Sequence, residues 1–249
     1  DFTYDAASQL TNAADVFSTY GYDYDAAGRL ISVDNAGTTG VPNVIFDYGY
    51  DAANNLISVS DSIDGVASGV EEFGYDALNR VESITQSGTG VSDKRIDYTY
   101  DQASQRVKSD RSSDLDGTNA IASTDYNYDD NGRLTDLDHS HDTEDIANYD
   151  YTYDKDSRIT EFASPEGISI YNYDDTDQLT SAEHDHQENE EYTYDDNGNR
   201  VGDGYSTGED NQLLSDGVYN YTYDGEGNRT EKTEIATGLV TEYTWDYRR

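Results

Sequence analysis

The chain has 249 residues, of which 34% are hydrophobic, and its 53 acidic and 15 basic side chains give a formal net charge of −38. This charge argues against nucleic acids and anionic membrane surfaces as partners, because both would be repelled, and leaves basic proteins and hydrated cations. The absence of Cys excludes a disulfide framework and Cys-ligated metal sites, and no apolar run reaches the length of a membrane span.

The same charge predicts an effect of salt on folding. Repulsion among carboxylates destabilises a compact state unless salt screens it, so we expect a salt-adapted protein whose stability rises with salt concentration. Low hydrophobicity with high net charge is also typical of disorder. The 24 Tyr residues recur periodically, however, which favours a folded chain built on amphipathic rings.

One short pattern recurs from the first residues to the last. Two aromatic residues separated by one position are followed by an Asp, here called the motif Asp, in eleven copies at intervals of 20 to 29 residues. Repetition at this period is typical of repeat architectures. The repeat signature, the second aromatic and the motif Asp of each copy, comprises Tyr4 and Asp5, Tyr24 and Asp25, Tyr50 and Asp51, Tyr75 and Asp76, Tyr100 and Asp101, Tyr128 and Asp129, Tyr153 and Asp154, Tyr173 and Asp174, Tyr194 and Asp195, Tyr223 and Asp224, and Trp245 and Asp246.

The residues before the motif Asp alternate as a strand requires. Val44, Phe46, Tyr48 and Tyr50 fall on one face of a strand with a period of two. Aromatic and β-branched residues are also strand formers. We therefore predict a β-strand leading into each motif Asp.

The third residue after the motif Asp is of a kind that accepts a left-handed backbone. No β-branched or large apolar residue occurs there, and the motif Asp can accept backbone N–H bonds in a turn. This predicts a hairpin loop of four or five residues. In copy order the third residues are Ser8, Gly28, Asn54, Asn79, Ser104, Gly132, Ser157, Asp177, Gly198 and Gly227.

Apolar residues resume five and often eight positions after the motif Asp, as in Leu30 and Val33. An odd offset of three puts such residues on opposite faces of a regular strand. Either both faces of the sheet are partly covered, or a bulge re-aims one residue.

Three copies depart from this spacing. After Asp101, Asp195 and Asp224 the restart comes one position later. An Arg stands just before it in each copy, namely Arg106, Arg200 and Arg229. We expect the loops of these copies to be longer by one residue.

The predicted fold class is all-β, a repetitive strip of antiparallel β-hairpins with two strands and two turns per repeat. We expect residues 1–249 to form a single array without a linker, as a fragment of a longer parent chain. Residues 202–217 contain a restart at Leu213 without the aromatic pattern and are interpreted as a degenerate copy.

These residues resemble the YD-repeat, or rearrangement-hotspot (Rhs), family, whose hallmark is a Tyr-Asp dipeptide followed by a Gly-Arg/Asn-Leu-type restart. Residues 128–134 (Tyr-Asp-Asp-Asn-Gly-Arg-Leu) match it, and the resemblance covers essentially the whole chain. It implies a β-solenoid-like strip that spirals into a hollow shell, as in bacterial Rhs toxins, the B and C components of insecticidal toxin complexes, and teneurins. In the toxins the shell encloses a C-terminal effector, and in teneurins it serves adhesion.

Two His pairs are the candidates for a metal site, because His139 with His141 and His184 with His186 stand at alternate positions. The pairs lie two repeats apart, which is about 19 Å in a flat sheet with strands roughly 4.8 Å apart. They cannot share one ion across that gap. Surface decoration is the favoured interpretation, and no metal site is predicted.

Two acidic segments, residues 114–119 and 129–132, are similar to calcium loops in composition. Neither has the full spacing that ends in a Glu, and Asp, Asn and Gly are also the residues that turns require. Turn chemistry is favoured. No cofactor is expected, apart from weak association of Ca²⁺ or monovalent cations.

No motif for catalysis occurs in the sequence. A nucleophile elbow, a phosphate loop and a zinc-protease motif are all absent. Carboxylates are so numerous that no pair is singled out as an acid and a base. We predict no catalytic residue and no enzymatic activity.

The predicted function is a non-catalytic wall segment of a secreted or cell-surface shell that encapsulates or displays another part of its parent chain, which is its main partner. The alternative is an extracellular adhesion surface that binds glycans or basic proteins. Because a strip of repeats leaves unpaired edge strands, end-to-end association into fibres is a third alternative.

Overall fold

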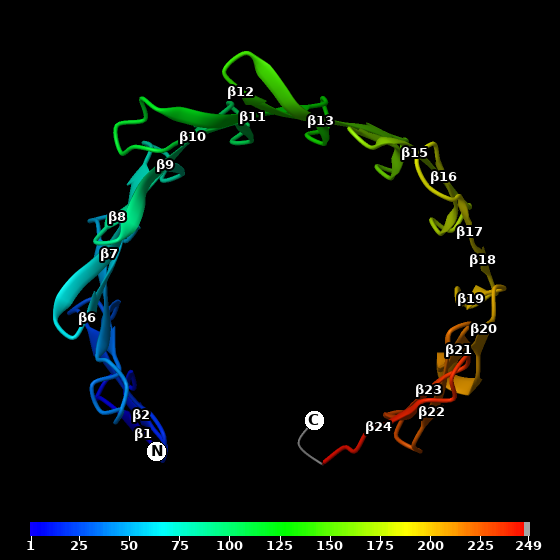
Figure 1. The fold of residues 1–249 in the computed structure, drawn as a ribbon, viewed down its shortest axis with the longest axis horizontal. Helices are drawn as coiled ribbons and strands as arrows, with labels where there is room; N and C mark the ends of the chain where they lie inside the picture. The colour runs from blue at the N-terminus through cyan, green and yellow to red at the C-terminus, as the bar shows by residue number, and fades with distance from the viewer. Residues whose placement is uncertain (247–249) are drawn as a thin grey trace. The chain divides into compact units, whose positions relative to one another are not determined.

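The structure, a computed structural model, describes residues 1–246 and consists of two compact units, residues 1–149 and the chain from Asp150 on. Each unit is built from antiparallel β-strands that follow one another in chain order (Figure 1). The described residues contain no α-helix, and therefore no helix that could cross a membrane. The predicted fold class, an all-β strip of hairpins, is confirmed.

In the first unit each strand pairs with the next one along the chain. Figure 1 shows that this sheet is bent. Its strands are β1 (Phe2–Tyr4), β2 (Leu10–Ala14), β3 (Thr19–Tyr24), β4 (Leu30–Asp34), β5 (Val44–Tyr50), β6 (Leu56–Ile63), β7 (Val66–Tyr75), β8 (Val81–Gly88), β9 (Val91–Tyr100), β10 (Arg106–Ser112), β11 (Ala120–Tyr128) and β12 (Leu134–His141), and β13 (Glu144–Tyr153) begins here.

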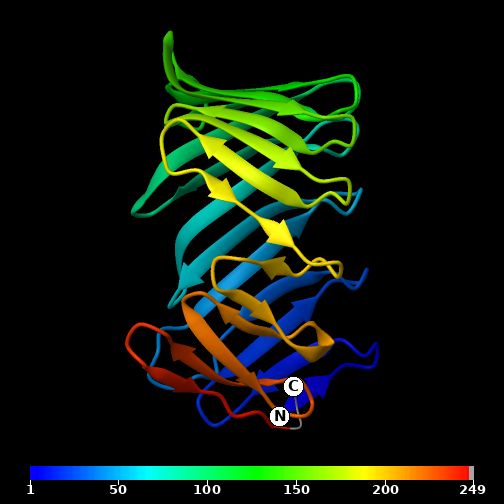
Figure 2. The ribbon, with the colours of Figure 1, turned by 90° about the vertical axis from the view of Figure 1, so that its right-hand side faces the viewer.

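The second unit continues the same hairpin pattern with shorter strands, and hairpin loops connect their ends (Figure 2). A 3₁₀ turn, η1 (Glu209–Asn211), interrupts it. The strands after β13 are β14 (Ile159–Ser164), β15 (Gly167–Tyr173), β16 (Leu179–His184), β17 (Glu190–Glu191), β18 (Thr193–Tyr194), β19 (Arg200–Val201), β20 (Tyr205–Thr207), β21 (Leu213–Asp216), β22 (Tyr219–Tyr223), β23 (Arg229–Glu234) and β24 (Val240–Glu242).

The predicted hairpin loop follows every motif Asp from Asp5 to Asp224. The motif Asp donates its N–H to the carbonyl four positions on, and the third residue donates its N–H back to the motif Asp carbonyl. In the copy at Asp25 these bonds measure 2.9 and 3.0 Å. The third residue has a φ between 58° and 84° in all these copies, which confirms the left-handed conformation expected from its residue types.

A bulge after each loop explains the odd spacing of the apolar residues. Tyr24 pairs with Leu30, but Tyr22 pairs with Val33, because the register shifts by one residue between the two pairs. Ile31 is the extra residue. Since cross-strand partners share a face, Leu30 and Val33 lie on the same side as both Tyr rings. Of the two alternatives, the bulge is the one observed.

The two sides of each sheet therefore differ in chemistry. The side that carries both motif aromatics and their apolar partners is called the aromatic face. The other side, the polar face, carries the residue between the two aromatics and its partner, such as Gly49 opposite Ser58 or Asn127 opposite Asp136.

The prediction of three longer loops is wrong. The loops after Asp101, Asp195 and Asp224 contain the same two backbone bonds as the other loops. The Arg that precedes the apparent restart takes the place of the apolar residue. Arg106 keeps that position on the aromatic face because its guanidinium Cζ lies over the Tyr98 ring, 4.2 Å from the centroid.

A loop of the same kind lies within residues 202–217. The N–H of Gly208 donates to the carbonyl of Gln212 at 2.8 Å, and Asn211 has a φ of 57°. The carbonyl of Leu213 accepts a hydrogen bond from the Tyr223 hydroxyl at 2.8 Å, as restart residues do in other copies. This segment keeps the loop and the restart without a motif Asp.

Few side chains are buried, because each sheet is a single layer. Among the described residues the buried hydrophobic ones are Ala182 and Tyr221, which are 2% and 8% exposed. The buried polar residues are Ser109, Ser112, Thr124 and Ser169. Without a second layer to form a core, backbone ladders and side-chain links between copies must carry much of the stability.

The loop geometry predicts opposite effects for two glycines of one loop. Gly227→Ala should destabilise the protein by roughly 1–2 kcal/mol, because Gly227 has a φ of 83° and Ala pays the left-handed penalty. Gly225→Ala should be neutral or stabilising, because Gly225 is not in the left-handed region and nothing lies within 4 Å of its added Cβ. Urea unfolding of both variants measures the difference, and equal destabilisation would contradict the loop geometry.

Candidate functional site

The motif Asp closes its own loop through its side chain. In the copy at Asp76, Oδ1 accepts hydrogen bonds from the backbone N–H groups of Leu78 at 2.8 Å and Arg80 at 3.0 Å. Oδ2 accepts a hydrogen bond from Arg80 Nε at 2.7 Å. The side chains of Asp76 and Arg80 are only 19% and 23% exposed, so this ion pair is held in one geometry.

These bonds lower the pKa of several motif carboxyls below the ordinary value for Asp, among them Asp25, Asp51, Asp76 and Asp129. For Asp25, Asp76 and Asp129 the largest cause is the backbone N–H of the Arg four positions on, and the guanidinium of the same Arg adds to it. For Asp51 the largest cause of the lowered pKa is the side-chain amide of Asn55. Hydrogen bonds to the ionised carboxylate favour that form.

Sequence reasoning missed the residue four positions after the motif Asp, which links neighbouring loops. Arg29 Nη1 donates to Asn54 Oδ1 in the next loop at 2.8 Å. Its guanidinium Cζ lies 4.7 Å from the centroid of the Tyr50 ring. The same arrangement joins Arg80 to Ser104 and Tyr100, and Arg158 to Asp177 and Tyr173.

A signal for this link is present in the aligned copies. The fourth position contains only residues with planar N–H donors, and their polarity hides them among the other loop residues. In copy order they are Gln9, Arg29, Asn55, Arg80, Gln105, Arg133, Arg158, Gln178, Asn199 and Asn228.

In most copies the second aromatic donates a hydrogen bond to a residue of the preceding copy. The Tyr50 hydroxyl donates to the carbonyl of Leu30 at 2.9 Å. Trp245 keeps the link, since its indole Nε1 donates to the carbonyl of Arg229 at 2.7 Å. The same bond to the preceding restart is made by Tyr24, Tyr75, Tyr100, Tyr128, Tyr173, Tyr194 and Tyr223. The signature residues therefore have a structural role, because they connect successive copies of the repeat.

The four His candidates make local contacts. His139 Nδ1 lies 2.9 Å from a Thr hydroxyl of β11, and His184 Nδ1 lies 2.7 Å from a Ser hydroxyl of β15. The rings of His184 and His186 meet edge to face, with centroids 5.5 Å apart. His141 ends β12 and is half exposed. Within residues 1–246 no three His, Cys, Asp or Glu side chains are arranged to hold a metal ion.

The two calcium-like segments use their carboxylates in their own turns. Asp114 Oδ1 accepts from the backbone N–H of Thr118 at 3.0 Å and of Asn119 at 3.2 Å. Asp129 accepts from the backbone N–H of Asn131 and from both the backbone and Nε of Arg133. Calcium binding stays a prediction.

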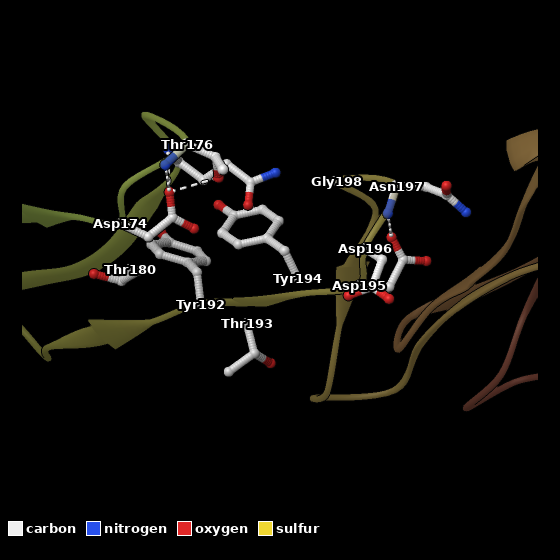
Figure 3. A pocket seen from close by; sticks show the side chains of 11 residues that line it. Asp174, Thr176, Thr180, Tyr192, Thr193, Tyr194, Asp195, Asp196, Asn197 and Gly198 are labelled. Atoms are coloured by element: carbon white, nitrogen blue, oxygen red, sulfur yellow. Dashed lines mark hydrogen bonds between the residues drawn. The ribbon is translucent and has the colours of Figure 1, made fainter.

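Two cavities open at equivalent places between successive copies of the second unit. The larger, of about 830 Å³, lies between the loop after Asp174 and the next copy, with Tyr192 and Tyr194 in its wall. Figure 3 shows Asp174 and Thr176 beside these two rings. The other, of about 600 Å³, lies between the loop after Asp224 and residues 243–246.

A third cavity, of about 360 Å³, is a hollow in the aromatic face and has a mainly apolar lining. Its walls come from two successive copies of the second unit. The lining residues are Tyr151, Ile159, Phe162, Tyr171, Tyr173 and Leu179.

Comparison with known families agrees with the resemblance expected from the sequence. Residues 43–166, about half of the chain, match the model of the family described as Teneurin YD-shell. The resemblance to YD-repeat proteins is confirmed over this part of the chain. No curated protein matches the chain.

Solved structures share the fold at low sequence identity. The crystal structure of TcdB2-TccC3-Cdc42 matches with a TM-score of 0.67 and 13% identity over 94% of this chain. The crystal structure of TcdB2-TccC3 without its hypervariable C-terminal region matches with a TM-score of 0.66 and 14% identity over 97% of this chain. The chain spans only 16% and 15% of the length of those two chains.

The hydrogen bonds of the second aromatics predict that removing the hydroxyl affects stability differently at the two aromatics of one copy. Tyr50→Phe should cost about 1 kcal/mol, because it removes the hydrogen bond to the carbonyl of Leu30 and keeps the ring. Tyr48→Phe is the matched control, since the described structure shows no hydrogen bond from the Tyr48 hydroxyl. Urea unfolding compares the two, and an equal effect would show that the hydroxyl link contributes nothing.

The lowered carboxyl pKa values predict a pH-dependent stabilisation. Asp76 has a folded pKa below its ordinary value of 3.8, so its contribution is present above about pH 4 and is lost as pH falls through the folded pKa. The stability difference between the wild type and Asp76→Asn should therefore be constant from pH 7 to 5 and shrink below about pH 4. Denaturant unfolding over this pH range measures it.

A control for this experiment is Asp47→Asn. It makes the same change in net charge on the exposed polar face, away from any loop after a motif Asp. A stability difference for Asp76→Asn that grows on acidification would contradict the role assigned to the loop carboxylate.

Proposed function

We propose that this chain is a non-catalytic wall segment of a secreted or cell-surface YD-repeat shell that encapsulates or displays another part of its parent chain. The observation that carries the proposal is the contrast between the two faces of a single-layer sheet. Most motif aromatics and apolar partners line one face without being buried, and Phe46 on the same face is 42% exposed. A sheet of this kind suits a wall between two different environments.

The structural neighbours support this proposal. Their fold is shared over nearly the whole of this chain, which is about a sixth of theirs. One of them is described as lacking a hypervariable C-terminal region, so in that protein the shared fold belongs to a longer chain with a separable part. An enclosed or displayed segment of the parent is accordingly the partner we propose, and an extracellular location fits the same relatives.

Two adjacent positions of β5 test the proposal. Phe46 lies on the aromatic face and Asp47 on the polar face, and both are exposed. The chain has no natural Cys, so Phe46→Cys and Asp47→Cys each introduce one thiol. In a parent chain freed of other thiols, we expect a 5-kDa polyethylene-glycol maleimide to modify only one of the two variants, while a small maleimide modifies both.

The isolated 249-residue chain is the control, and both of its variants should react with the large reagent. Equal modification of both variants in the intact parent would contradict a closed wall. Disruption of the parent by denaturant should restore reaction at the protected position.

The second candidate is an adhesion surface that binds glycans, and the hollow of the aromatic face favours it. Tyr171 and Tyr173 contribute rings to this hollow from alternate positions of β15, which lie on the same face of the strand. Aromatic rings with a polar edge are suited to stacking on sugars. Retention of the isolated chain on a glycan array, and its loss in Tyr171→Ala, separates this function from that of a wall.

A further inference from the structure

Several copies of the repeat carry a filled slot between one loop and the next. Arg158 shows how the slot is filled in the second unit: its Nε donates to Asp154 Oδ2 at 2.7 Å, and its Nη1 donates to Asp177 Oδ1 at 2.7 Å. Its guanidinium Cζ also lies 4.7 Å from the centroid of the Tyr173 ring. The slot thus offers a carboxylate, a ring face and an acceptor on the next loop.

In the next copy the slot keeps the carboxylate and the ring but contains no Arg, and Gly198 stands where Asp177 supplies the side-chain acceptor of the filled slot. Gln178 stands in place of the Arg and lines the cavity, with its Nε2 2.8 Å from the position that a Cβ of Gly198 would take, and its side chain makes no hydrogen bond within the described chain. Asp174 Oδ1 accepts hydrogen bonds from Thr176 and from the backbone N–H of Gln178. Asp174 Oδ2, the atom that corresponds to the acceptor for Arg Nε, receives no donor from residues 1–246.

The ring of this slot is held in place although no cation covers it in the described structure. The Tyr194 hydroxyl donates to the carbonyl of Leu179 at 2.9 Å, which fixes the ring as in the filled copies. The cavity of about 830 Å³ lies here and extends to Asp195 and the exposed Asp196. Figure 3 shows Asp174 beside the rings of Tyr192 and Tyr194, with Asp195 farther along the same chain.

We propose that this slot binds an arginine side chain of a basic protein partner. The observation that carries the proposal is internal: the chain places its own Arg in the equivalent slots, with the guanidinium between a carboxylate and a Tyr ring. A planar guanidinium can pair with Asp174 and stack on Tyr194 at the same time, which an ammonium does less well. The net charge of −38 favours the approach of a basic partner.

The equivalent cavity two copies of the motif later differs from this slot in its carboxylate. There Asn228 Nδ2 donates to Asp224 Oδ2 at 2.9 Å, so the carboxylate oxygen is already engaged. Trp245 supplies the ring and is 54% exposed. This second cavity is therefore a natural comparison site that lacks the free acceptor.

A titration of the 249-residue chain with N-acetylarginine amide tests the proposal. We expect saturable binding with a dissociation constant of about a millimolar, as for one exposed charge pair with a cation–π contact, and the largest amide NMR shifts at Tyr194, Asp195 and Gly198. N-acetylcitrulline amide, which has the same shape without the charge, should bind at least about tenfold more weakly because charge-assisted hydrogen bonds are lost.

Variants of the slot decide the outcome. Gln178→Arg should place an arginine of the chain in its own slot, abolish binding of N-acetylarginine amide and raise the melting temperature. Asn228→Arg is the matched control, because it adds the same charge at the equivalent position of the other cavity and should leave the shifts at Tyr194 in place.

Asp174→Asn provides a second test that does not depend on the added Arg. It keeps an Oδ1 acceptor for the loop and should weaken binding about tenfold or more, because the charged partner is lost. Equal binding of the citrulline and arginine amides, or undiminished binding by Gln178→Arg or Asp174→Asn, would overturn the proposal. None of these results depends on whether the parent forms a closed shell.

Discussion

The carboxylate of the motif Asp is the interaction on which the rest of the repeat depends. Its Oδ1 gathers the backbone N–H groups of the loop, as Asp76 does with Leu78 and Arg80, and this holds the third residue in the left-handed region. The strand that follows the loop has one residue more than the strand it pairs with, and this extra residue forms the bulge. Because the bulge shifts the register, Leu30 and Val33 both face the Tyr rings. The hydrogen bonds within the loop after the motif Asp therefore determine which face of the sheet is apolar.

The sequence was sufficient to predict the loop, because steric exclusion at its third residue is a property of a single position and shows in every copy. The bulge remained one of two alternatives, since apolar spacing does not report the pairing register. The longer loop after Asp101 was predicted wrongly because the restart was identified by its apolar character. Its position is set by backbone bonds, and Arg106 can occupy it by stacking on Tyr98. The slot at Gln178 could not be predicted, because it depends on a contact that other copies make and this copy lacks.

A single-layer sheet has little core to hold neighbouring copies together, so side chains that reach across copies take on that task. Tyr suits the role because its ring covers the sheet while its hydroxyl reaches a carbonyl of the preceding copy, as Tyr50 does with Leu30. Trp245 can replace Tyr because its indole N–H donates in the same direction. This explains how a chain with 34% hydrophobic residues and a large acid excess still forms ordered strands.

The fourth residue after the motif Asp decides what a copy does beyond closing its own loop. An Arg there uses its charge within the sheet, whereas Gln178 leaves Asp174 Oδ2 and the Tyr194 ring facing an open cavity. Gln in place of Arg leaves the backbone of the loop unchanged, because the loops after Asp154 and Asp174 contain the same two backbone bonds. Substitution at one position can therefore turn a structural link into a binding slot without altering the strand pairing around it. Gln also stands at this position after Asp5 and Asp101, where its Nε2 donates to a carbonyl of a later loop, so the same exchange in different copies yields either a link or an open slot.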